Sequence, residues 1–392
     1  MTHLPDSTSI FSSSPHCPFV PVFGAPSRMF VRGSGTELWD SDGRRYLDFL
    51  AGIAVVSLGH SNPAVARAIG EQATVLLHVS NYFANPMATR AAIAVDRILG
   101  GGGQVFFCNS GAEANETAIK LARRHGGRGR HVVVSALGSF HGRTLGALAA
   151  TGQPSKHEPF QPMPEGFRHV PFADTSALES ALDDTVAAVL VEPIQGEGGV
   201  VVPPPGYLAD VERLCRDRGI LFMVDEVQTG CARTGRWFAF QHDNVTPDVV
   251  CLAKGLGNGM PIGAMWARRE VAASFTPGDH GSTFSGTAIA TAAVVAVLTE
   301  MERIDAPNRA ERLGKMLSSR LDALDGVIKV RGKGLLLAAE VAVDARELAM
   351  RALDRGLVIN AVTTTAIRFA PPLTVTEEEI EEAVSMLGEV IG

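Results

Sequence analysis

The sequence has few cysteines and no long apolar run, and both absences narrow the kinds of protein it can encode. Its five cysteines are odd in number and form no CxxC pair. A disulfide framework is therefore not expected, and the thiols are expected to stay reduced, as in a cytoplasm. No stretch of about eighteen apolar residues occurs, so no membrane span is expected. These absences indicate a soluble, cytoplasmic protein.

A strong charge of one sign is also missing. The formal net charge is −7, and the positive residues are scattered. The densest basic stretch, residues 123–130 (RRHGGRGR), is short and has no aromatic residue, which is typical of a solvated helix end and not of a nucleic-acid surface. Residues 1–20 lack the basic and apolar regions of a signal peptide, and their Ser, Thr and Pro content predicts a poorly ordered tail.

The chain does have 46% hydrophobic residues over 392 positions, enough for a large core and roughly two domains. Between residues 100 and 270, short apolar runs alternate with helical stretches such as 114–124 and 206–218. This alternation predicts an α/β fold with a mostly parallel sheet and helices on both faces. The predicted strands are Gln104–Cys108, His131–Val134, Ala187–Val191, Ile220–Val224 and Val249–Leu252.

The two ends of the chain predict a second, smaller α+β domain. After about residue 288 come an Ala/Val-rich helix, a charged helix, two short strands, a helix, a strand and an acidic helix. Near the start, two strand-like pieces flank the turn Ser41–Gly43. We expect a large domain of residues 50–287 and a small domain of residues 21–49 with 288–392.

Charged residues stand where two of the buried strands end. Asp225 and Glu226 follow the strand that ends at Val224, and Lys254 follows the strand that ends at Leu252. Ligands of parallel sheets bind beyond the carboxyl ends of the strands, which meet at one edge. Taken singly, the acids also fit a helix N-cap or a metal ligand, and the lysine also fits an ion pair.

A third feature follows the strand 104–108. The segment Asn109–Glu113 (NSGAE) leads into a helix, and free amides at a helix start form an anion site, although the segment also fits a plain N-cap. An anion site, a carboxylate and a lysine together match the phosphate, ring nitrogen and aldehyde of pyridoxal phosphate. A nicotinamide cofactor is disfavoured because the only glycine run, 100–103, precedes a strand instead of following one.

Longer segments carry a resemblance to a known family. They are YLDFLAGIAV, FFCNSGAEANE, SFHGRTLGALAATGQ, VEPIQGEGGV, VDEVQTG, LAKGLGNGMPIGA, GSTF and IRFAPPL. On these segments, from about Gly35 to the C-terminus, the chain resembles the class III aminotransferases of fold type I. The resemblance implies a large sheet domain with a smaller α+β domain, and pyridoxal 5'-phosphate as the cofactor.

The resemblance also implies cofactor contacts. Lys254 matches the lysine that forms a Schiff base with the cofactor, and Asp225 matches the acid at the ring nitrogen. The other matched positions are Ser110, Gly111 and Ala112 at the phosphate, Phe140 stacked on the ring, the segment Glu226, Val227 and Gln228, with Gln228 near the phenolic oxygen, and Thr283. Thr283 matches a threonine that comes from the second subunit, so the resemblance implies a homodimer with shared active sites.

Substrate contacts follow from the same matching. Arg143 and Arg368 match carboxylate-binding arginines, and two guanidinium groups suit a dicarboxylate such as glutamate or 2-oxoglutarate. Glu197 matches an acid that pairs with an arginine and lets the site accept two amino donors in turn, and Ser282 matches a contact to an acetylated substrate. Each arginine also fits a structural ion pair, and Glu197 also fits a plain loop carboxylate.

The implied reaction is a two-step transamination in arginine biosynthesis. N2-acetyl-L-ornithine and 2-oxoglutarate give N-acetyl-L-glutamate 5-semialdehyde and L-glutamate. Open alternatives are an aminotransferase for succinylornithine, succinyl-diaminopimelate, ornithine or a lysine precursor, a pyridoxal-dependent aminomutase, and a cofactor-binding protein without catalysis. The sequence departs from the family pattern at Val56, Cys231 and Ser285–Ala288. We expect the first and last of these near the dimer contact and the substrate entrance.

Other candidate positions carry less information. His60, His78 and His141 stand in separate segments without a closely spaced carboxylate or cysteine, so no metal site is expected. Tyr82 and Phe83 fit either the substrate entrance or plain core packing.

Overall fold

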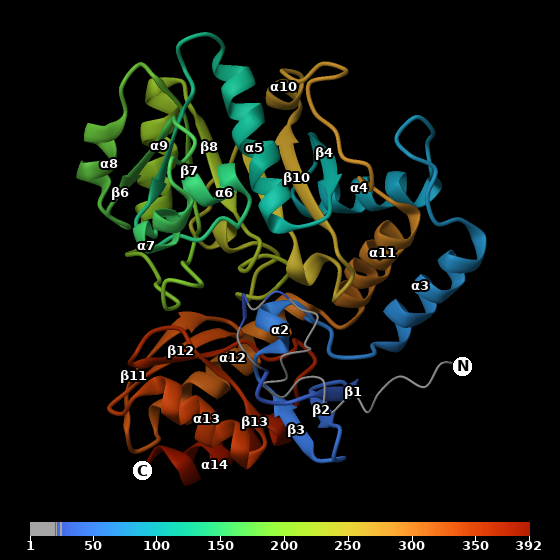
Figure 1. Cartoon of the computed structure of the whole chain (residues 1–392), viewed down its shortest axis with the longest axis vertical. Coiled ribbons are helices and arrows are strands. Elements are labelled where there is room, and N and C mark those ends of the chain that lie inside the picture. The colour runs from blue at the N-terminus through green and yellow to red at the C-terminus, as the bar shows by residue number, and fades with distance from the viewer. Residues whose placement is uncertain (1–19, 21, 24–25) are drawn as a thin grey trace.

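A seven-stranded sheet forms the centre of the larger part of the protein (Figure 1). The computed structural model describes residues 20, 22–23 and 26–392, so the tail predicted for residues 1–20 lies outside the described residues except for residue 20. The strand order is β4-β10-β9-β8-β7-β5-β6. The strands are β4 (Gly103–Cys108), β5 (Val132–Ala136), β6 (Phe167–Val170), β7 (Val186–Val191), β8 (Leu221–Asp225), β9 (Val249–Leu252) and β10 (Gly263–Arg268). Only β10 runs antiparallel to its neighbours, so the predicted mostly parallel sheet is confirmed.

The five predicted strands correspond to β4, β5, β7, β8 and β9. The sequence analysis missed β6 and β10. β6 (FRHV) is a half-buried edge strand with polar residues in its middle, and β10 (GAMWAR) begins at a glycine within a motif that resembles a loop. β6 therefore lacks the uniform apolar run that marks a strand buried on both faces, whereas β10 has such a run, Ala264–Ala267, directly after the glycine-rich lysine segment.

Side chains on the central strands are buried on both sides because helices cover both faces. Along β8, Leu221 and Met223 pack into one apolar cluster, whereas Phe222 and Val224 pack into another. α5 (Gly111–Gly126) contributes its apolar side to the first cluster, and α9 (Tyr207–Arg218) contributes to the second. The remaining helical segments of this part are α6 (Leu145–Ala150), α7 (Pro154–His157), α8 (Thr175–Ala181), α10 (Arg269–Ala272), η1 (Glu158–Phe160), η2 (Ala239–His242) and η3 (Lys254–Leu256).

Three longer helices lie beside the β4 edge of the sheet (Figure 1). They are α3 (Pro63–Val75), α4 (Pro86–Ile98) and α11 (Ala288–Arg303). Both α3 and α4 begin with an asparagine whose side chain accepts amide hydrogens of the first turn, followed by a proline, which is a strong helix start. α11 packs against α3 and α4 along its length.

The smaller part contains two four-stranded sheets and three helices. One sheet has the order β1-β2-β3-β13 and the other the order β11-β12-β15-β14. Their strands are β1 (Phe30–Ser34), β2 (Glu37–Asp40), β3 (Arg45–Asp48), β11 (Val327–Lys333), β12 (Leu336–Val341), β13 (Leu357–Val358), β14 (Asn360–Ala361) and β15 (Ala366–Phe369). The helices are α12 (Ala306–Asp322), α13 (Ala345–Arg355) and α14 (Glu377–Ile391), and the short α2 (Ala51–Ala54) follows β3.

The pairing of β3 with β13 brings the start of the chain against its C-terminal third. This pairing agrees with the expectation that residues 21–49 join the small domain. α11, however, is also assigned to that domain, and it packs mainly against α3 and α4. The boundaries at residues 49 and 287 therefore stay a prediction. Of the helices in the described part of the chain, none combines the length and the apolar character needed to cross a membrane.

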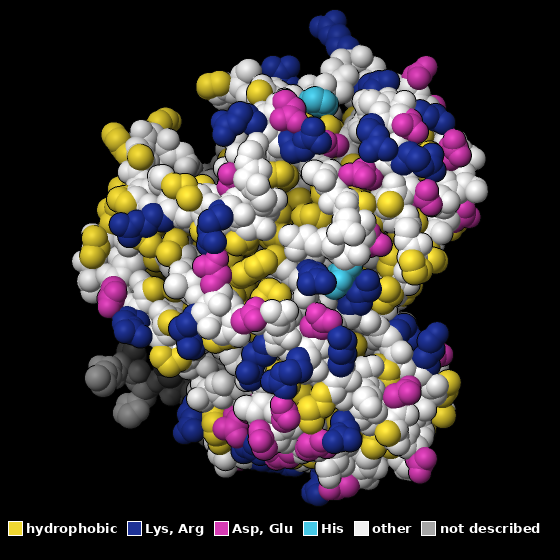
Figure 2. Space-filling model, turned by 180° about the vertical axis from the view of Figure 1, so that it is seen from behind, with side chains coloured by type: hydrophobic (Ala, Val, Ile, Leu, Met, Phe, Trp, Pro, Cys, Tyr) yellow, Lys and Arg dark blue, Asp and Glu magenta, His cyan; other side chains and the backbone are white. Residues whose placement is uncertain are grey.

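Apolar side chains are exposed where the loop between α3 and α4 meets the loop before α11. Thr287 Oγ1 donates to the carbonyl of Leu77, and Asn81 donates to the carbonyl of Ser282, so the two loops lie together. We call this area the loop surface; its exposed apolar residues are Val75, Leu77, Tyr82, Phe83 and Phe284. Figure 2 shows apolar side chains gathered at this edge of the molecule. Tyr82 is 93% exposed, so the core-packing reading of Tyr82 and Phe83 is wrong.

Gly263 in β10 packs closely against the turn before α5, so a larger residue at this position measures how tightly the sheet holds that turn. A Cβ at position 263 would lie 2.3 Å from the carbonyl oxygen of Ser110 and 2.9 Å from the sulfur of Cys108. Because the closest atom is backbone, we expect Gly263→Ala to lower the free energy of unfolding by roughly 1–3 kcal/mol, measured by urea denaturation. Gly70→Ala is the control, since Gly70 lies on α3 with nothing near its Cβ, and alanine there should stabilise by up to about 1 kcal/mol. Equal stability of the two variants would contradict this account.

Candidate active site

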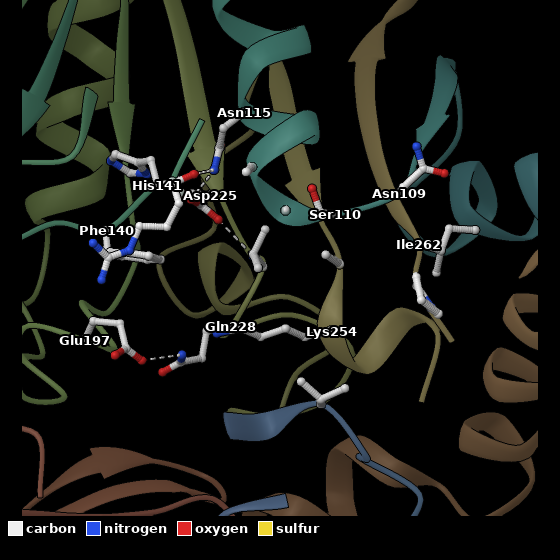
Figure 3. A pocket seen from close by; sticks show the side chains of 18 of the residues that line it. Asn109, Ser110, Asn115, Phe140, His141, Glu197, Asp225, Gln228, Lys254 and Ile262 are labelled. Atoms are coloured by element: carbon white, nitrogen blue, oxygen red, sulfur yellow. Dashed lines mark hydrogen bonds and ion pairs between the residues drawn. The ribbon is translucent and has the colours of Figure 1, made fainter. Parts of the chain in front are cut away.

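A cavity of about 380 Å³ opens at the carboxyl edge of the central sheet (Figure 3). Loops that follow β4, β5, β7, β8 and β9 all contribute to its wall, as expected for the carboxyl ends of parallel strands. Of the residues proposed from the sequence, the cavity is lined by Ser110, Gly111, Ala112, Phe140, Arg143, Glu197, Asp225, Val227, Gln228 and Lys254. The structure thus brings together side chains from five separate segments.

The turn Ser110–Ala112 forms the start of α5. The Ser110 side chain accepts the amide hydrogen of Glu113 at 3.2 Å and therefore caps the helix. Among the described residues, the amides of Gly111 and Ala112 donate to no recorded acceptor, and both residues line the cavity. Two free amides at the start of a sixteen-residue helix form a site for an anion.

Asp225 ends β8 and is held by three donors, although it is only 4% exposed. Its Oδ2 accepts from Asn115 Nδ2 at 2.7 Å and contacts His141 Nδ1 at 2.8 Å, and its Oδ1 accepts from the amide of Val227 at 3.0 Å. Because a carboxylate only accepts, the His141 proton lies on Nδ1. This network leaves the carboxylate rigid at the cavity wall.

Lys254 follows β9 and extends into the cavity (Figure 3). Its backbone has φ +45°, a left-handed conformation that non-glycine residues adopt rarely and that clusters at functional sites. Burial lowers the pKa of Lys254 to about 8, against the attraction of Glu197 and other nearby carboxylates. A substantial fraction of this amine is therefore neutral near physiological pH.

Phe140 and Arg143 follow β5 on one side of the cavity. The amide of Phe140 donates to Glu192 Oε2 at 3.0 Å, and the guanidinium of Arg143 lies 5.6 Å from the Phe140 ring centre. Glu192 also accepts from the amide of Gly196 through Oε1. It therefore ties the loop after β5 to the loop that carries Glu197. Burial raises the pKa of Glu192 to about 7.

Arg368 on β15 belongs to the smaller part of the protein, is fully buried, and contacts two residues of the cavity wall. Its Nη1 donates to Glu197 Oε1 at 2.5 Å and to Gln228 Oε1 at 3.1 Å. Burial alone would raise the pKa of Glu197, but the attraction of Arg368 and Lys254 outweighs it and lowers the pKa. Among the described residues, Arg368 Nη2 has no hydrogen-bond partner.

Besides Arg368, which lies behind Glu197 and Gln228, three expected site residues are not part of the cavity lining in the single chain. Glu226 is buried behind the wall, where its carboxylate accepts from Thr229 Oγ1 and the amide of Phe240; its expected cofactor contact is therefore not supported. Successive side chains at a strand end point in opposite directions. The side chain of Glu226 therefore points away from the cavity that Asp225 faces, and its oxygen atoms meet other donors there. Ser282 and Thr283 lie on the loop surface. Ser282 Oγ accepts from Asn109 Nδ2 at 3.0 Å, and Thr283 is exposed.

The sequence analysis missed several residues of the site. His141 was considered only as a metal ligand, yet it binds Asp225. Asn109 was named only within the segment of the anion site, and Asn115 and Glu192 were not proposed at all. Two signals were available, the position of His141 beside Phe140 and that of Glu192 directly after the predicted strand Ala187–Val191. Asn115 lies on α5, about one turn after the amides of Gly111 and Ala112, and only the packing of α5 against β8 brings it to Asp225.

Of the three departures from the family pattern, one lies beside a residue that lines the cavity. Val56 approaches Gly259, which lines the cavity, and Ser285 Oγ donates to the carbonyl of Phe107 on β4. Cys231 is buried, with a left-handed φ of +54°. None of these three contacts Asp225 or Lys254 among the recorded hydrogen bonds of the described residues.

Comparison with known proteins places the chain in a family. Residues 23–391 match the sequence profile of the class-III aminotransferases. An acetylornithine aminotransferase from Caldanaerobacter subterraneus subsp. tengcongensis is 48% identical over 373 residues, which cover 93% of this chain and 94% of that protein.

Solved structures agree with this assignment. The ornithine aminotransferase of Toxoplasma gondii, which holds PLP at partial occupancy in its active site, is 37% identical, with a TM-score of 0.90 and coverage of 95% of this chain and 92% of that chain. The acetylornithine aminotransferase of Elizabethkingia anophelis is 36% identical, with a TM-score of 0.84 and coverage of 93% and 94%. Enzymes of this class use pyridoxal 5'-phosphate. The chain belongs to the class-III aminotransferases.

Proposed function

We propose that this aminotransferase converts N2-acetyl-L-ornithine and 2-oxoglutarate into N-acetyl-L-glutamate 5-semialdehyde and L-glutamate, a step of arginine biosynthesis. The names of its relatives at up to 48% identity support this donor. The observation that carries the proposal is the buried Arg368 beside Lys254, paired with Glu197 yet with a free Nη2. Such an arginine can bind the second carboxylate of 2-oxoglutarate or glutamate. When acetylornithine is bound instead, Glu197 can neutralise its charge.

The residues at the cavity fit pyridoxal phosphate. The free amides of Gly111 and Ala112 suit its phosphate, and the fixed carboxylate of Asp225 suits a protonated ring nitrogen. The partly neutral amine of Lys254 suits its aldehyde. When bound, the cofactor stabilises negative charge at the substrate carbon and carries the amino group between substrates.

We assign the protein groups the following roles. Lys254 Nζ holds the cofactor and, when released, moves the proton at the substrate carbon. Asp225 keeps the ring nitrogen protonated, and Asn115, His141 and the Val227 amide orient Asp225. Phe140, Val227 and Gln228 line the cavity, where Phe140 would pack against the ring of the cofactor.

The substrate contacts divide between two arginines. Arg143 at the cavity wall has no recorded ion pair among the described residues, so its guanidinium is available for the carboxylate of acetylornithine. Arg368 takes a carboxylate of glutamate or 2-oxoglutarate once Glu197 has moved away. Ser282 contacts the acetylated end of the donor in this proposal.

A second candidate donor is ornithine. Ornithine aminotransferases are among the solved structures to which this chain is similar, with a TM-score of 0.91 for one from Toxoplasma gondii ME49. The two donors differ by an acetyl group that removes the charge of the α-amine, so a direct comparison separates them.

A donor panel tests the proposed substrate. Without an oxo-acid acceptor, each donor should convert the cofactor spectrum of the wild type in a single turnover. We expect acetylornithine to exceed ornithine, succinylornithine and 4-aminobutyrate by roughly 10-fold or more in kcat/KM. Lys254→Ala should lose the absorbance band of the lysine-bound cofactor. This variant therefore checks that Lys254 is the residue that binds the cofactor. A faster reaction with ornithine would replace the proposed donor, and repeated turnover without any acceptor, beyond one equivalent of product per site, would indicate an aminomutase.

The lowered pKa of Lys254 can be tested on the cofactor-free protein. Only the neutral amine reacts with acetic anhydride, so the acylation rate rises with pH through the pKa. We expect the rate at Lys254, measured by mass spectrometry after short pulses, to reach half of its maximum near pH 8. A free lysine side chain in the same solution serves as the reference, with its midpoint near about pH 10.4. A Lys254 rate that follows the reference would contradict the burial argument.

We also propose that the enzyme is a cytoplasmic homodimer in which Thr283 reaches the partner's cofactor phosphate. The exposed apolar loop surface beside Thr283 supports a subunit contact, because large exposed apolar patches mark interfaces. The four described cysteines are free and buried, in keeping with a reducing compartment.

Mixed dimers test the shared site. Thr283→Ala and Lys254→Ala should each retain little lysine-bound cofactor at limiting cofactor concentration. When the two variants are unfolded together and refolded, heterodimers contain one intact site, so about a quarter of all sites should regain the cofactor band. Each variant refolded alone is the control. Sedimentation of the wild type as a monomer, or absence of recovery in the mixture, would refute the shared site.

A further inference from the structure

Gln228 closes a ring of hydrogen bonds between Arg368 and Glu197. Its Oε1 accepts from Arg368 Nη1 at 3.1 Å, and its Nε2 donates to Glu197 Oε1 at 3.3 Å, as Figure 3 shows for the second bond. The direct bond between Arg368 and Glu197 completes the ring. The orientation of the amide follows from chemistry, because the reversed amide would place a donor against a guanidinium and an acceptor against a carboxylate.

The three residues come from three separate segments and differ in their freedom to move. Arg368 is fully buried on β15, and Gln228 is 8% exposed in the loop after β8. The Glu197 side chain, on the loop after β7, is 32% exposed. Glu197 is therefore the member that can leave toward solvent, while Gln228 stays beside Arg368.

Arg368 cannot serve a substrate carboxylate fully while Glu197 is in place. Its Nε donates to Asn360 Oδ1 at 3.2 Å, and its Nη1 is shared between Glu197 and Gln228. Only Nη2 is without a partner among the described residues. A bidentate carboxylate needs two adjacent nitrogens, so the binding of a dicarboxylate requires Glu197 to give up Nη1. Any interaction that stabilises Glu197 on Arg368 must be broken first and therefore weakens dicarboxylate binding.

We propose that Gln228 is a latch, a positioning residue that holds Glu197 on Arg368 and so sets the selectivity between dicarboxylate and monocarboxylate substrates. The inference rests on the proposed function, in which one substrate is a dicarboxylate. Gln228 stabilises only the closed arrangement through Nε2, because that bond is lost when Glu197 leaves. Through Oε1 it also occupies Nη1, the nitrogen that the incoming carboxylate needs.

Asn360 gives a contrasting contact to the same arginine. It accepts from Arg368 Nε and makes no recorded bond to Glu197. Its support of the guanidinium is therefore the same whether Glu197 is bound or absent. A substitution at Asn360 should therefore leave dicarboxylate binding nearly unchanged, whereas a substitution at Gln228 should strengthen it.

The test compares Gln228→Met, which keeps the length but removes both polar atoms, with Asn360→Ala. Binding of glutarate, an unreactive dicarboxylate, is measured by calorimetry on the holoenzyme. Hydrogen bonds to charged groups set the scale, so we expect glutarate affinity to rise about 10-fold in Gln228→Met and to stay within about 3-fold of wild type in Asn360→Ala. Because Gln228 also lines the cofactor cavity, the readout in Gln228→Met is the ratio of the two KM values and not kcat, and the KM for glutamate should fall by a similar factor relative to the KM for acetylornithine.

A double-mutant cycle separates a latch from general damage. If Gln228 acts by holding Glu197, then Gln228→Met should add little to glutarate affinity in a Glu197→Ala background, where no carboxylate remains to be held. Equal gains in both backgrounds, or weaker glutarate binding in Gln228→Met, would overturn the latch. A wild type that neither binds glutarate nor reacts with glutamate would instead contradict the proposed function.

Discussion

The carboxylate of Asp225 at the end of β8 is the contact on which the rest of the site depends. A buried carboxylate needs several donors, and the fold supplies them from α5, from the loop after β5 and from its own loop. These donors fix the separations between the segments that line the cavity. The helix start that can bind an anion and the lysine after β9 therefore lie at fixed positions relative to Asp225.

The sheet explains why so many polar groups gather at one place. β5, β7, β8 and β9 run in parallel, so their carboxyl ends meet at one edge. The amides of Gly111 and Ala112 at the start of α5 reach the same edge after β4. Charged residues placed along the strands would be buried without partners, whereas at the strand ends they share one polar cavity.

Much of this arrangement could be predicted from the sequence, and the rest depends on packing. Uniform apolar runs predicted five of the seven central strands, and residues that directly follow those runs, such as Asp225 and Lys254, were found in the cavity. Asn115 could not be found in this way, because its role comes from the face that α5 presents to β8. Glu192 directly follows the predicted strand Ala187–Val191, so the same rule applied there would have found it. Glu226 is the opposite case, because it was expected at the cofactor together with its neighbour Asp225. The alternation of side chains at the strand end instead directs its carboxylate to the amide of Phe240.

Two fully buried arginines show how the same side chain can serve a fixed or an exchangeable role. Arg233 donates to the carbonyls of Leu335 and Pro371 and to the hydroxyl of Ser57, and burial lowers its pKa to about 9. Its two carbonyl partners belong to the backbone and cannot leave without moving the chain. The partners of Arg368 are all side chains, which exchange by rotation alone. A site that must bind two different substrates in turn at one arginine requires partners of the second kind.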